Sequence, residues 1–186
     1  MLEITVAICT YNREKYLNQL FDSILAQTLD KHCFEVILVN NNSPGNTKEL
    51  FTTFCDNNSQ IQGLYSEENK QGLSHARNKA IALARAPLIT FLDDDAFIDT
   101  HYLEKCVKIF SKHPQIIAVG GKILLHYEST VPTWENKYIN SLLGYFNLGE
   151  KSFLFTKKSY PRGSNMIFKT DIFKKVGTFN TSLGRT

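Results

Sequence analysis

The sequence has few of the features that would assign it quickly to a common class of protein. It contains four cysteines among 186 residues. They form neither a CxxC pair nor a Cys/His spacing typical of a zinc site. Because three of them fall inside apolar patterns, we interpret them as small, reduced core residues; the four are Cys9, Cys33, Cys55 and Cys106.

A strong charge and a long apolar run are also missing. The net charge is only +3 and the basic residues are dispersed, so no nucleic-acid partner is expected. No run approaches the roughly 20 apolar residues that span a bilayer. The N-terminal stretch MLEITVAICTYNRE has no basic region before its short apolar segment, so it does not resemble a signal peptide. We therefore expect a cytoplasmic protein with no membrane segment in this chain.

The familiar phosphate-binding motifs are absent as well. There is no GxxxxGK[ST], which argues against a Walker-type NTPase, and no GxGxxG after the first apolar run, which argues against an NAD-type dehydrogenase. An aspartyl-phosphate phosphatase would place DxDx[TV] after its first strand. Here the acidic motif follows the fourth apolar run, and Phe97 occupies its fifth position.

What the sequence does contain is a regular alternation of two patterns. With 42% apolar and 21% charged residues, the composition is that of an ordinary globular domain. Short apolar runs typical of buried strands alternate with three- and four-residue spacings typical of helices. This order predicts an α/β fold with a mostly parallel central sheet and helices on both faces. The strands are expected at residues 4–9, 34–39, 61–66 and 88–92, and the helices at 17–25, 50–55, 73–84 and 103–110.

The ends of several elements can also be predicted. Asn12, Ser74 and Asp99 are plausible N-caps for the first, third and fourth helices. After the fourth helix the patterns predict a fifth strand at 116–125, a short helix within 134–144 and a strand at 164–169. A brief helix then ends at Gly177.

Polar residues follow three of the predicted strands. In an open parallel sheet, ligands bind beyond the carboxyl ends of the strands, so these residues are expected to meet at one edge. Arg77, on the intervening helix, is expected to face the same edge. The converging segments are Thr10–Tyr11–Asn12–Arg13, Asn40–Asn41–Asn42–Ser43 and Asp93–Asp94–Asp95.

The three consecutive aspartates allow two interpretations. They can be solvated residues near a helix start, but one cap needs one residue and Asp99 is available for that. Adjacent carboxylates repel one another unless a cation offsets their charge. Hard divalent ions take oxygen ligands, and Mg²⁺ typically uses one or two carboxylates together with substrate phosphates. The position of the aspartates favours metal-assisted phosphate binding.

Several long motifs resemble family-2 glycosyltransferases, in the same order and across essentially the whole chain. They are TVAICTYNREKYLNQLFDSILAQT, FEVILVNNNSPGNT, NKQGLSHARNKAI, LITFLDDDAFI and RGSNMIFKTDIFKKVGTFN. The resemblance implies a Rossmann-like nucleotide-diphospho-sugar transferase fold. It also implies transfer of a sugar, with inversion, from a nucleotide-diphospho-sugar, typically a UDP-sugar, with Mg²⁺ or Mn²⁺. The implied acceptor is a glycan or lipid-linked hydroxyl in polysaccharide or surface glycan synthesis, which can bring the enzyme to the inner face of a membrane.

The resemblance also implies roles for individual residues. Thr10, Tyr11, Asn12 and Arg13 would line the nucleoside site together with Asn40 and Asn41, and Arg77 would contact the base or the diphosphate. Asp93 and Asp94 would approach the ribose and the metal, Asp95 would be the principal metal ligand, and Gly163, Ser164 and Asn165 would lie near the acceptor and the sugar. The alternative for Tyr11 is a packing residue at a helix start, and the alternative for Arg77 is a solvated helix arginine.

Two departures from the family pattern matter. Asn40 and Asn41 stand where the family usually carries one or two aspartates that accept a hydrogen bond from the uracil N–H. An amide oxygen can accept the same bond. The general base of the family follows the GTFN-like segment, so it is expected beyond Thr186; after Arg162 the only acidic residue is Asp171.

These departures shape the predicted organisation. We expect residues 1–186 to form one glycosyltransferase domain truncated at its C-terminus, with a nucleotide-binding half at 1–125 and the start of an acceptor half at 126–186. One alternative is a sugar-nucleotide-binding module without turnover, because the base is missing. A nucleotidyltransferase is a weaker alternative, since CTYNRE is not the glycine-rich basic loop that such an enzyme needs after its first strand.

Overall fold

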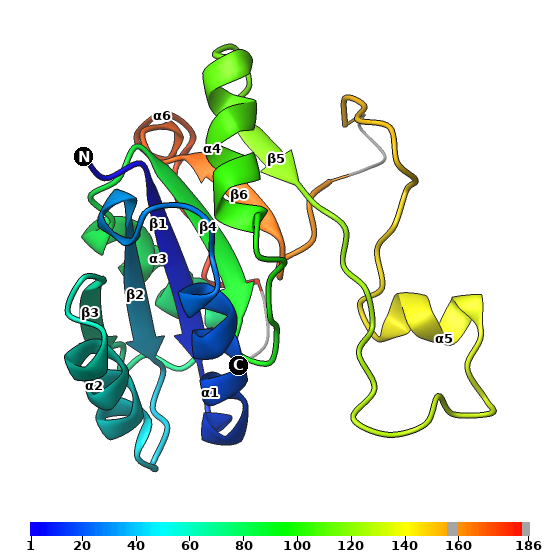
Figure 1. Ribbon diagram of the computed structural model, residues 1–186, viewed down its shortest axis with the longest axis horizontal. Helices are drawn as coiled ribbons and strands as arrows, with labels where there is room; N and C mark the ends of the chain where they lie inside the picture. The colour runs from blue at the N-terminus through cyan, green and yellow to red at the C-terminus, as the bar shows by residue number, and fades with distance from the viewer. Residues whose placement is uncertain (156–159, 184–186) are drawn as a thin grey trace.

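The protein is built around a six-stranded sheet with the strand order β3-β2-β1-β4-β6-β5 (Figure 1). The computed structural model describes residues 1–155 and 160–183. The strands are β1 (Ile4–Thr10), β2 (Phe34–Asn40), β3 (Gln62–Glu67), β4 (Leu88–Asp93), β5 (Ala118–Gly120) and β6 (Met166–Lys169). The α-helices are α1 (Glu14–Leu25), α2 (Thr47–Asn57), α3 (Leu73–Leu83), α4 (Tyr102–Lys112), α5 (Lys137–Leu142) and α6 (Ile172–Val176), with a 3₁₀ turn at Lys31–Cys33.

The four strands predicted from apolar runs are confirmed, and they are parallel. Ile4 lies opposite both Phe34 of β2 and Leu88 of β4, so β1 is the central strand of this part of the sheet. All seven residues of β2 are buried, which explains why its apolar pattern is continuous and does not alternate. β6 joins β4 in the antiparallel sense, and β5 pairs with β6. The predicted mostly parallel sheet is therefore correct.

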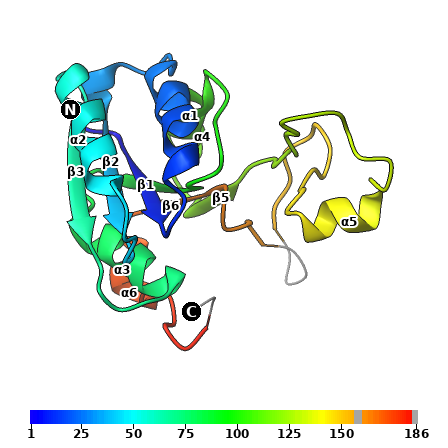
Figure 2. The same ribbon diagram turned by 90° about the horizontal axis from the view of Figure 1, so that it is seen from below.

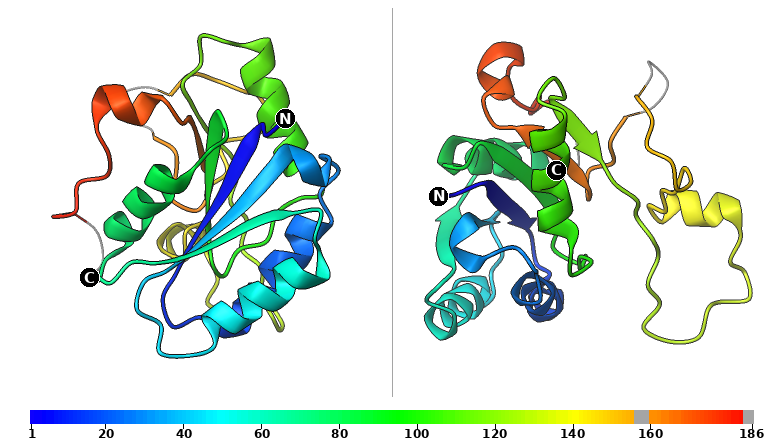
Figure 3. Two further views of the ribbon diagram at one scale, coloured as in Figure 1. Left: turned by 90° about the vertical axis from the view of Figure 1, so that its left-hand side faces the viewer. Right: turned by 45° about the horizontal axis from the view of Figure 1, so that its top comes forward.

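Helices cover both faces of the sheet, as Figures 2 and 3 show. One face packs against α1, α2 and α4, where the side chains of Phe21 and Phe54 stack with ring centroids 4.5 Å apart. The other face packs against α3, whose buried residues Ala76 and Ala80 allow the helix to approach the strands closely. Because small side chains face the sheet on α3, its apolar stripe is weaker than those of α1 and α4.

A buried carboxylate ties three segments together at the amino edge of the sheet. Glu35 of β2 is fully buried and accepts hydrogen bonds from the Thr5 hydroxyl of β1 at 2.6 Å and from the Arg85 backbone N–H at 2.8 Å. The Arg85 Nε donates to its second oxygen at 2.7 Å. Since a buried charge is costly without partners, these bonds account for Glu35 inside the sheet. They also hold the entry to β4 in place.

The three predicted N-caps are wrong. Arg13, Gly72 and His101 occupy the cap positions of α1, α3 and α4, and none of them makes a side-chain cap bond. Asn12 has a left-handed backbone, and its N–H donates to Ser43. The other two predicted caps make different hydrogen bonds. The Ser74 hydroxyl donates to the Leu183 carbonyl, and the Asp99 carboxylate accepts the His101 N–H in the turn before α4.

The fifth predicted strand is much shorter than its apolar run. β5 covers three residues, which pair with Phe168, Ile167 and Met166 of β6. At Gly121, a side chain would meet the Asn165 amide, with an added Cβ only 2.4 Å from Nδ2. Beyond this point residues 122–155, here called the arm, extend away from the sheet and carry α5 (Figures 1 and 2).

The four cysteines are free thiols, as expected. Cys106 is buried and belongs to the core, whereas Cys9, Cys33 and Cys55 are only partly buried, so the prediction of core positions is only partly correct. In the described part of the chain, no helix has the length and apolar character needed to cross a membrane.

Candidate functional site

The segments that follow β1, β2 and β4 come together at the carboxyl edge of the sheet, as predicted. The backbone N–H of Asn41 donates to the Thr10 carbonyl at 2.9 Å, which joins the ends of β1 and β2. The Asn12 N–H donates to the Ser43 hydroxyl at 2.9 Å. On the other side, the Arg13 guanidinium contacts the Asp95 carboxylate beyond β4. The loop after β1 therefore bridges its two neighbours.

The three aspartates have different partners, and the nearby guanidinium groups offset part of their mutual repulsion. Asp93 ends β4, and its Oδ1 lies 3.7 Å from an Arg77 nitrogen. Asp95 pairs with Arg13 on the opposite side. The side chains of Asp93 and Asp95 are about equally exposed, at 43% and 42%, whereas Asp94 between them is buried. Two carboxylates are thus presented to a ligand and one is not.

Asp94 differs electrostatically from an ordinary surface aspartate. Burial raises the pKa of its carboxyl to about 6, although the Thr10 hydroxyl and the Arg13 charge oppose this shift. The neighbouring Asp95 charge adds to the increase in pKa. Since the folded pKa exceeds the ordinary value, the proton is held more tightly in the folded protein. This contribution to stability is present at low pH and is lost as pH rises towards 6.

Arg77 is held against the site by packing and by a hydrogen bond. Its guanidinium lies over the rings of Phe91 and Phe179, with centroid distances of 5.9 and 5.5 Å. Its Nη2 donates to the Gly163 carbonyl at 3.1 Å. With a side chain only 14% exposed, Arg77 is not a solvated helix arginine. It is a nearly fixed positive charge beside Asp93.

The asparagines after β2 make more internal hydrogen bonds than the sequence indicated. Both N–H groups of the buried Asn41 amide donate, to the carbonyls of Glu68 and Lys70 at 2.7 and 2.8 Å. Its Oδ1 accepts the Gly72 N–H at 2.8 Å. The Asn40 Oδ1 accepts the Ser43 N–H at 2.8 Å. The Asn41 amide thus holds the segment between β3 and α3, and the oxygens of both amides accept a hydrogen bond within the protein.

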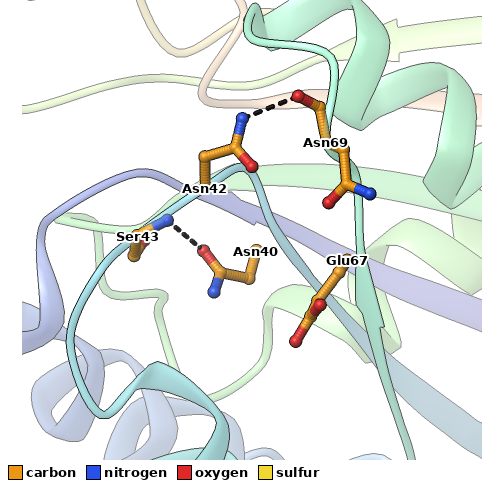
Figure 4. Close-up of a pocket in the computed structure, with 5 residues that line it drawn as sticks. All are labelled: Asn40, Asn42, Ser43, Glu67 and Asn69. Carbon is orange, nitrogen blue, oxygen red and sulfur yellow. Dashed lines mark hydrogen bonds between the residues drawn. The ribbon is translucent and has the colours of Figure 1, made fainter.

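A polar pocket of about 240 Å³ opens between the ends of β2 and β3 (Figure 4). It is lined by Asn40, Asn42, Ser43, Glu67 and Asn69. Sequence reasoning missed Glu67 and Asn69, because only the loops after the first, second and fourth strands were considered. The same rule applied to the third strand identifies both, since β3 ends at Glu67.

Residues 163–165 also lie at this edge, because the antiparallel β6 begins at Met166 opposite Phe91 of β4. Gly163 lies against Arg77, and an added Cβ would be 2.8 Å from its Nη2. The Asn165 amide is engaged within the protein: it accepts from the Tyr102 hydroxyl at 2.9 Å and donates to the Lys122 carbonyl at 2.8 Å. Tyr11, in contrast, is exposed beside the site.

The exposed carboxylates determine what kind of metal site this edge can form. Among the described residues, no group of three or more His, Cys, Asp or Glu side chains is arranged to hold an ion. Asp93 and Asp95 nevertheless offer two hard oxygen ligands at the rim of the edge. This donor set fits Mg²⁺ or Mn²⁺ completed by ligand phosphates and water, and it does not fit a site made only of protein groups.

Comparison with models of protein families identifies the family of this chain. The model of the family described as glycosyl transferase family 2 matches residues 5–177. The chain belongs to this family. The match includes the three carboxyl-edge loops, Arg77 and residues 163–165, which are the segments that the fold brings together.

Two curated relatives illustrate the similarity. The glucosyl-dolichyl phosphate glucuronosyltransferase of Haloferax volcanii is 26% identical over 187 residues, which cover 99% of this chain and 58% of the relative. Glycosyltransferase GlyA of Streptococcus pneumoniae is 35% identical over 119 residues, 64% of this chain and 16% of the relative. The chain thus spans less than two thirds of the length of each.

Solved structures confirm the fold. Staphylococcus aureus TarS in complex with UDP matches 100% of this chain and 52% of its own with a TM-score of 0.73 and 21% identity. The mannosyltransferase PcManGT of Pyrobaculum calidifontis, in complex with GDP-Man and Mn²⁺, matches 97% of this chain and 48% of its own with a TM-score of 0.73 and 20% identity. At these identities the comparison supports the fold alone.

Proposed function

We propose that the carboxyl edge of this sheet binds a nucleotide-diphospho-sugar together with Mg²⁺ or Mn²⁺, as part of an inverting glycosyltransferase. The observation that carries the proposal is the arrangement of two exposed carboxylates, Asp93 and Asp95, each beside a guanidinium. A diphosphate that bridges a cation needs both kinds of charge within a few ångströms. TarS bound to UDP and PcManGT bound to GDP-Man and Mn²⁺ share the fold.

The proposed roles follow from position. Asp93 and Asp95 would hold the cation, which neutralises charge on the departing nucleoside diphosphate when bound. Arg77, held rigidly by Phe91 and Phe179, would contact a diphosphate oxygen or the base. Arg13 contacts Asp95, so its guanidinium lies close enough to contact the diphosphate as well. Thr10, Tyr11 and Asn12 would line the nucleoside.

The acceptor side is proposed at residues 163–165. Gly163, Ser164 and Asn165 lie at the edge that the sugar would occupy, next to Arg77 and Asp93. Inverting transfer needs a carboxylate near the acceptor hydroxyl, on the side opposite the leaving diphosphate. Asp171 does not meet this need. It precedes α6 and lines a separate cavity with Ala86 and Pro87, before β4 begins and at the opposite edge of the sheet.

Equilibrium binding tests the donor site. We expect UDP or GDP to bind to the wild-type chain in the presence of Mn²⁺ and more weakly when EDTA replaces the metal, as measured by titration calorimetry. Asp95→Asn should weaken metal-dependent binding about ten-fold or more, because a charged ligand of the cation is lost. Asp99→Asn is the matched control: this aspartate pairs with Lys105 outside the site and should leave the affinity unchanged.

The result that would contradict the proposal is the absence of nucleoside diphosphate binding with metal present, in a folded chain. Turnover distinguishes the two functional alternatives. Release of UDP or GDP from sugar nucleotides by these 186 residues would show that the base lies within the chain. Nucleotide binding without release of UDP or GDP would favour the alternative of a donor-binding module. The position of Asp171 away from the site supports this alternative.

A further inference from the structure

The pocket between β2 and β3 is lined by one carboxyl side chain, that of Glu67. Glu67 ends β3, and its carboxylate lies beside Asn40 in the pocket that Figure 4 shows. The Tyr65 hydroxyl donates to Glu67 Oε1 at 3.2 Å and accepts from Asn40 Nδ2 at 3.0 Å. This chain of hydrogen bonds orients the carboxylate through Oε1. Oε2 takes no part in it. The pocket is smaller than the roughly 300–1,000 Å³ of whole-ligand sites, so it suits one ring of a ligand.

The pocket is well placed for the base of the proposed donor. Neighbouring strands are about 4.8 Å apart, so the space between β2 and β3 lies on the order of 12 Å from β4 and its aspartates. An extended nucleoside with its phosphates covers such a span. The amides after β2, which would otherwise read the base, are engaged: Asn40 Oδ1 by Ser43 and the whole Asn41 amide by the β3–α3 segment.

We infer that Glu67 determines which base this site accepts, an inference that rests on the proposed function. A carboxylate only accepts hydrogen bonds, so it favours a base that presents a ring N–H. Uracil offers one such group between two carbonyls, and guanine offers a ring N–H beside an amino group. Cytosine and adenine place a ring nitrogen that is itself an acceptor beside their amino group, so the carboxylate can accept one bond from the amino group but is repelled by the ring nitrogen.

The neighbouring amides complete this recognition. The carbonyl beside the ring N–H of uracil or guanine needs a donor. Asn40 Nδ2 has a second hydrogen beyond the one given to Tyr65, and the Asn69 side chain lines the same pocket. An acceptor flanked by amide donors matches the –NH–C(=O)– edge that uracil and guanine share. The missing aspartate after β2 is thus replaced by a glutamate at the end of the next strand.

Binding of four nucleoside diphosphates to wild type and Glu67→Gln tests the inference. With Mn²⁺ present, we expect the wild-type chain to bind UDP or GDP about ten-fold or more tightly than CDP and ADP, since one well-paired base edge discriminates at this level. The tighter of UDP and GDP identifies the base. In Glu67→Gln the amide can donate to the cytosine ring nitrogen and accept from its amino group, so CDP affinity should rise while the preferred affinity falls.

Glu68→Gln is the matched control, because Glu68 accepts the Lys70 N–H and does not line the pocket. It should keep the wild-type order of affinities. The inference is overturned if the wild-type chain binds all four nucleotides equally, or if Glu67→Gln keeps the wild-type order. Either result leaves the donor site itself standing. If none of the four binds, the proposed function fails with it, and the two failures are therefore distinguishable.

Discussion

At the scale of single residues, Asn40 and Asn41 are engaged by the protein itself. By the resemblance, Asn40 and Asn41 stand where one or two aspartates are expected. In this protein the Asn41 amide is buried and donates twice to the β3–α3 segment. Only an amide can do this, because a carboxylate has no N–H to donate. Asn41 therefore shapes the pocket and does not present an acceptor to it.

Asn41→Asp should destabilise the protein, even though it restores the residue expected of the family. Two carbonyls lose their donors and a buried charge is added, so we expect the free energy of unfolding to fall by about 2 kcal/mol or more. Urea denaturation measures it. Asn42→Asp is the control, because Asn42 is exposed and Asp tolerates its left-handed backbone. Equal stability of Asn41→Asp and wild type would show that the amide bonds contribute little.

The thiol of Cys106 makes stability depend on pH in the alkaline range. Burial raises its pKa to about 12 from an ordinary value of 9.0. The folded protein therefore keeps a proton that the unfolded chain has lost, and stability falls as pH rises above 9 towards 12. At pH 10 the effect is about 1 kcal/mol.

Urea denaturation of wild type and Cys106→Ala at pH 7 and pH 10 measures this contribution. The variant should lose less stability between the two pH values, whatever its stability at pH 7. Cys9, whose pKa burial also raises to about 12, is unchanged in both proteins and cancels in the comparison. Identical losses in wild type and variant would show that the Cys106 thiol does not contribute.

At the scale of elements, the segment before β6 holds Arg77 of α3 beside Asp93. Gly163 has no side chain, and that space is taken by the Arg77 guanidinium, which donates to the Gly163 carbonyl. An antiparallel strand from the second half of the chain thus completes a site made by parallel strands of the first half. The pairing of β6 with β4 gives residues 163–165 their place.

Gly163→Ala should weaken nucleotide binding without unfolding the protein. The new methyl group would lie 2.8 Å from Nη2 and displace the Arg77 guanidinium from Asp93. We therefore expect affinity for UDP or GDP with Mn²⁺ to fall several-fold. Stability should change by less than about 1 kcal/mol, as for most changes near the surface. In an Arg77→Ala background the same substitution should have little further effect, which a double-mutant cycle measures. Additive effects would mean that Gly163 does not act through Arg77.

At the scale of the whole molecule, the arm is the part least supported by the sheet. It extends from β5 away from the sheet (Figure 2). It carries exposed apolar side chains, among them Trp134 and Leu142. Its bridge from Ile123 to Phe146 joins two parts of the arm to each other. The core below it is held by strand pairing and by helices on both faces.

Limited proteolysis with chymotrypsin should cut the arm first, at its exposed aromatic residues Trp134, Tyr138, Tyr145 and Phe153. The two fragments should elute together in gel filtration, because β6 remains paired with β4 and β5. They should separate in denaturant. Early cleavage at buried aromatic residues of the sheet, such as Phe91, would contradict this description of the fold.

The sequence by itself determined the alternation of strands and helices, and with it the edge where the aspartates and Arg77 meet. Those features depend on local periodicity and on a general property of parallel sheets. The tertiary structure alone decided which polar groups are free. The partners of Asn41 lie 27 to 31 residues away, and Ser74 donates to a carbonyl 109 residues further on. Hydrogen bonds across such separations leave no local pattern, so the displaced helix caps and the role of Glu67 emerge only when the chain is folded.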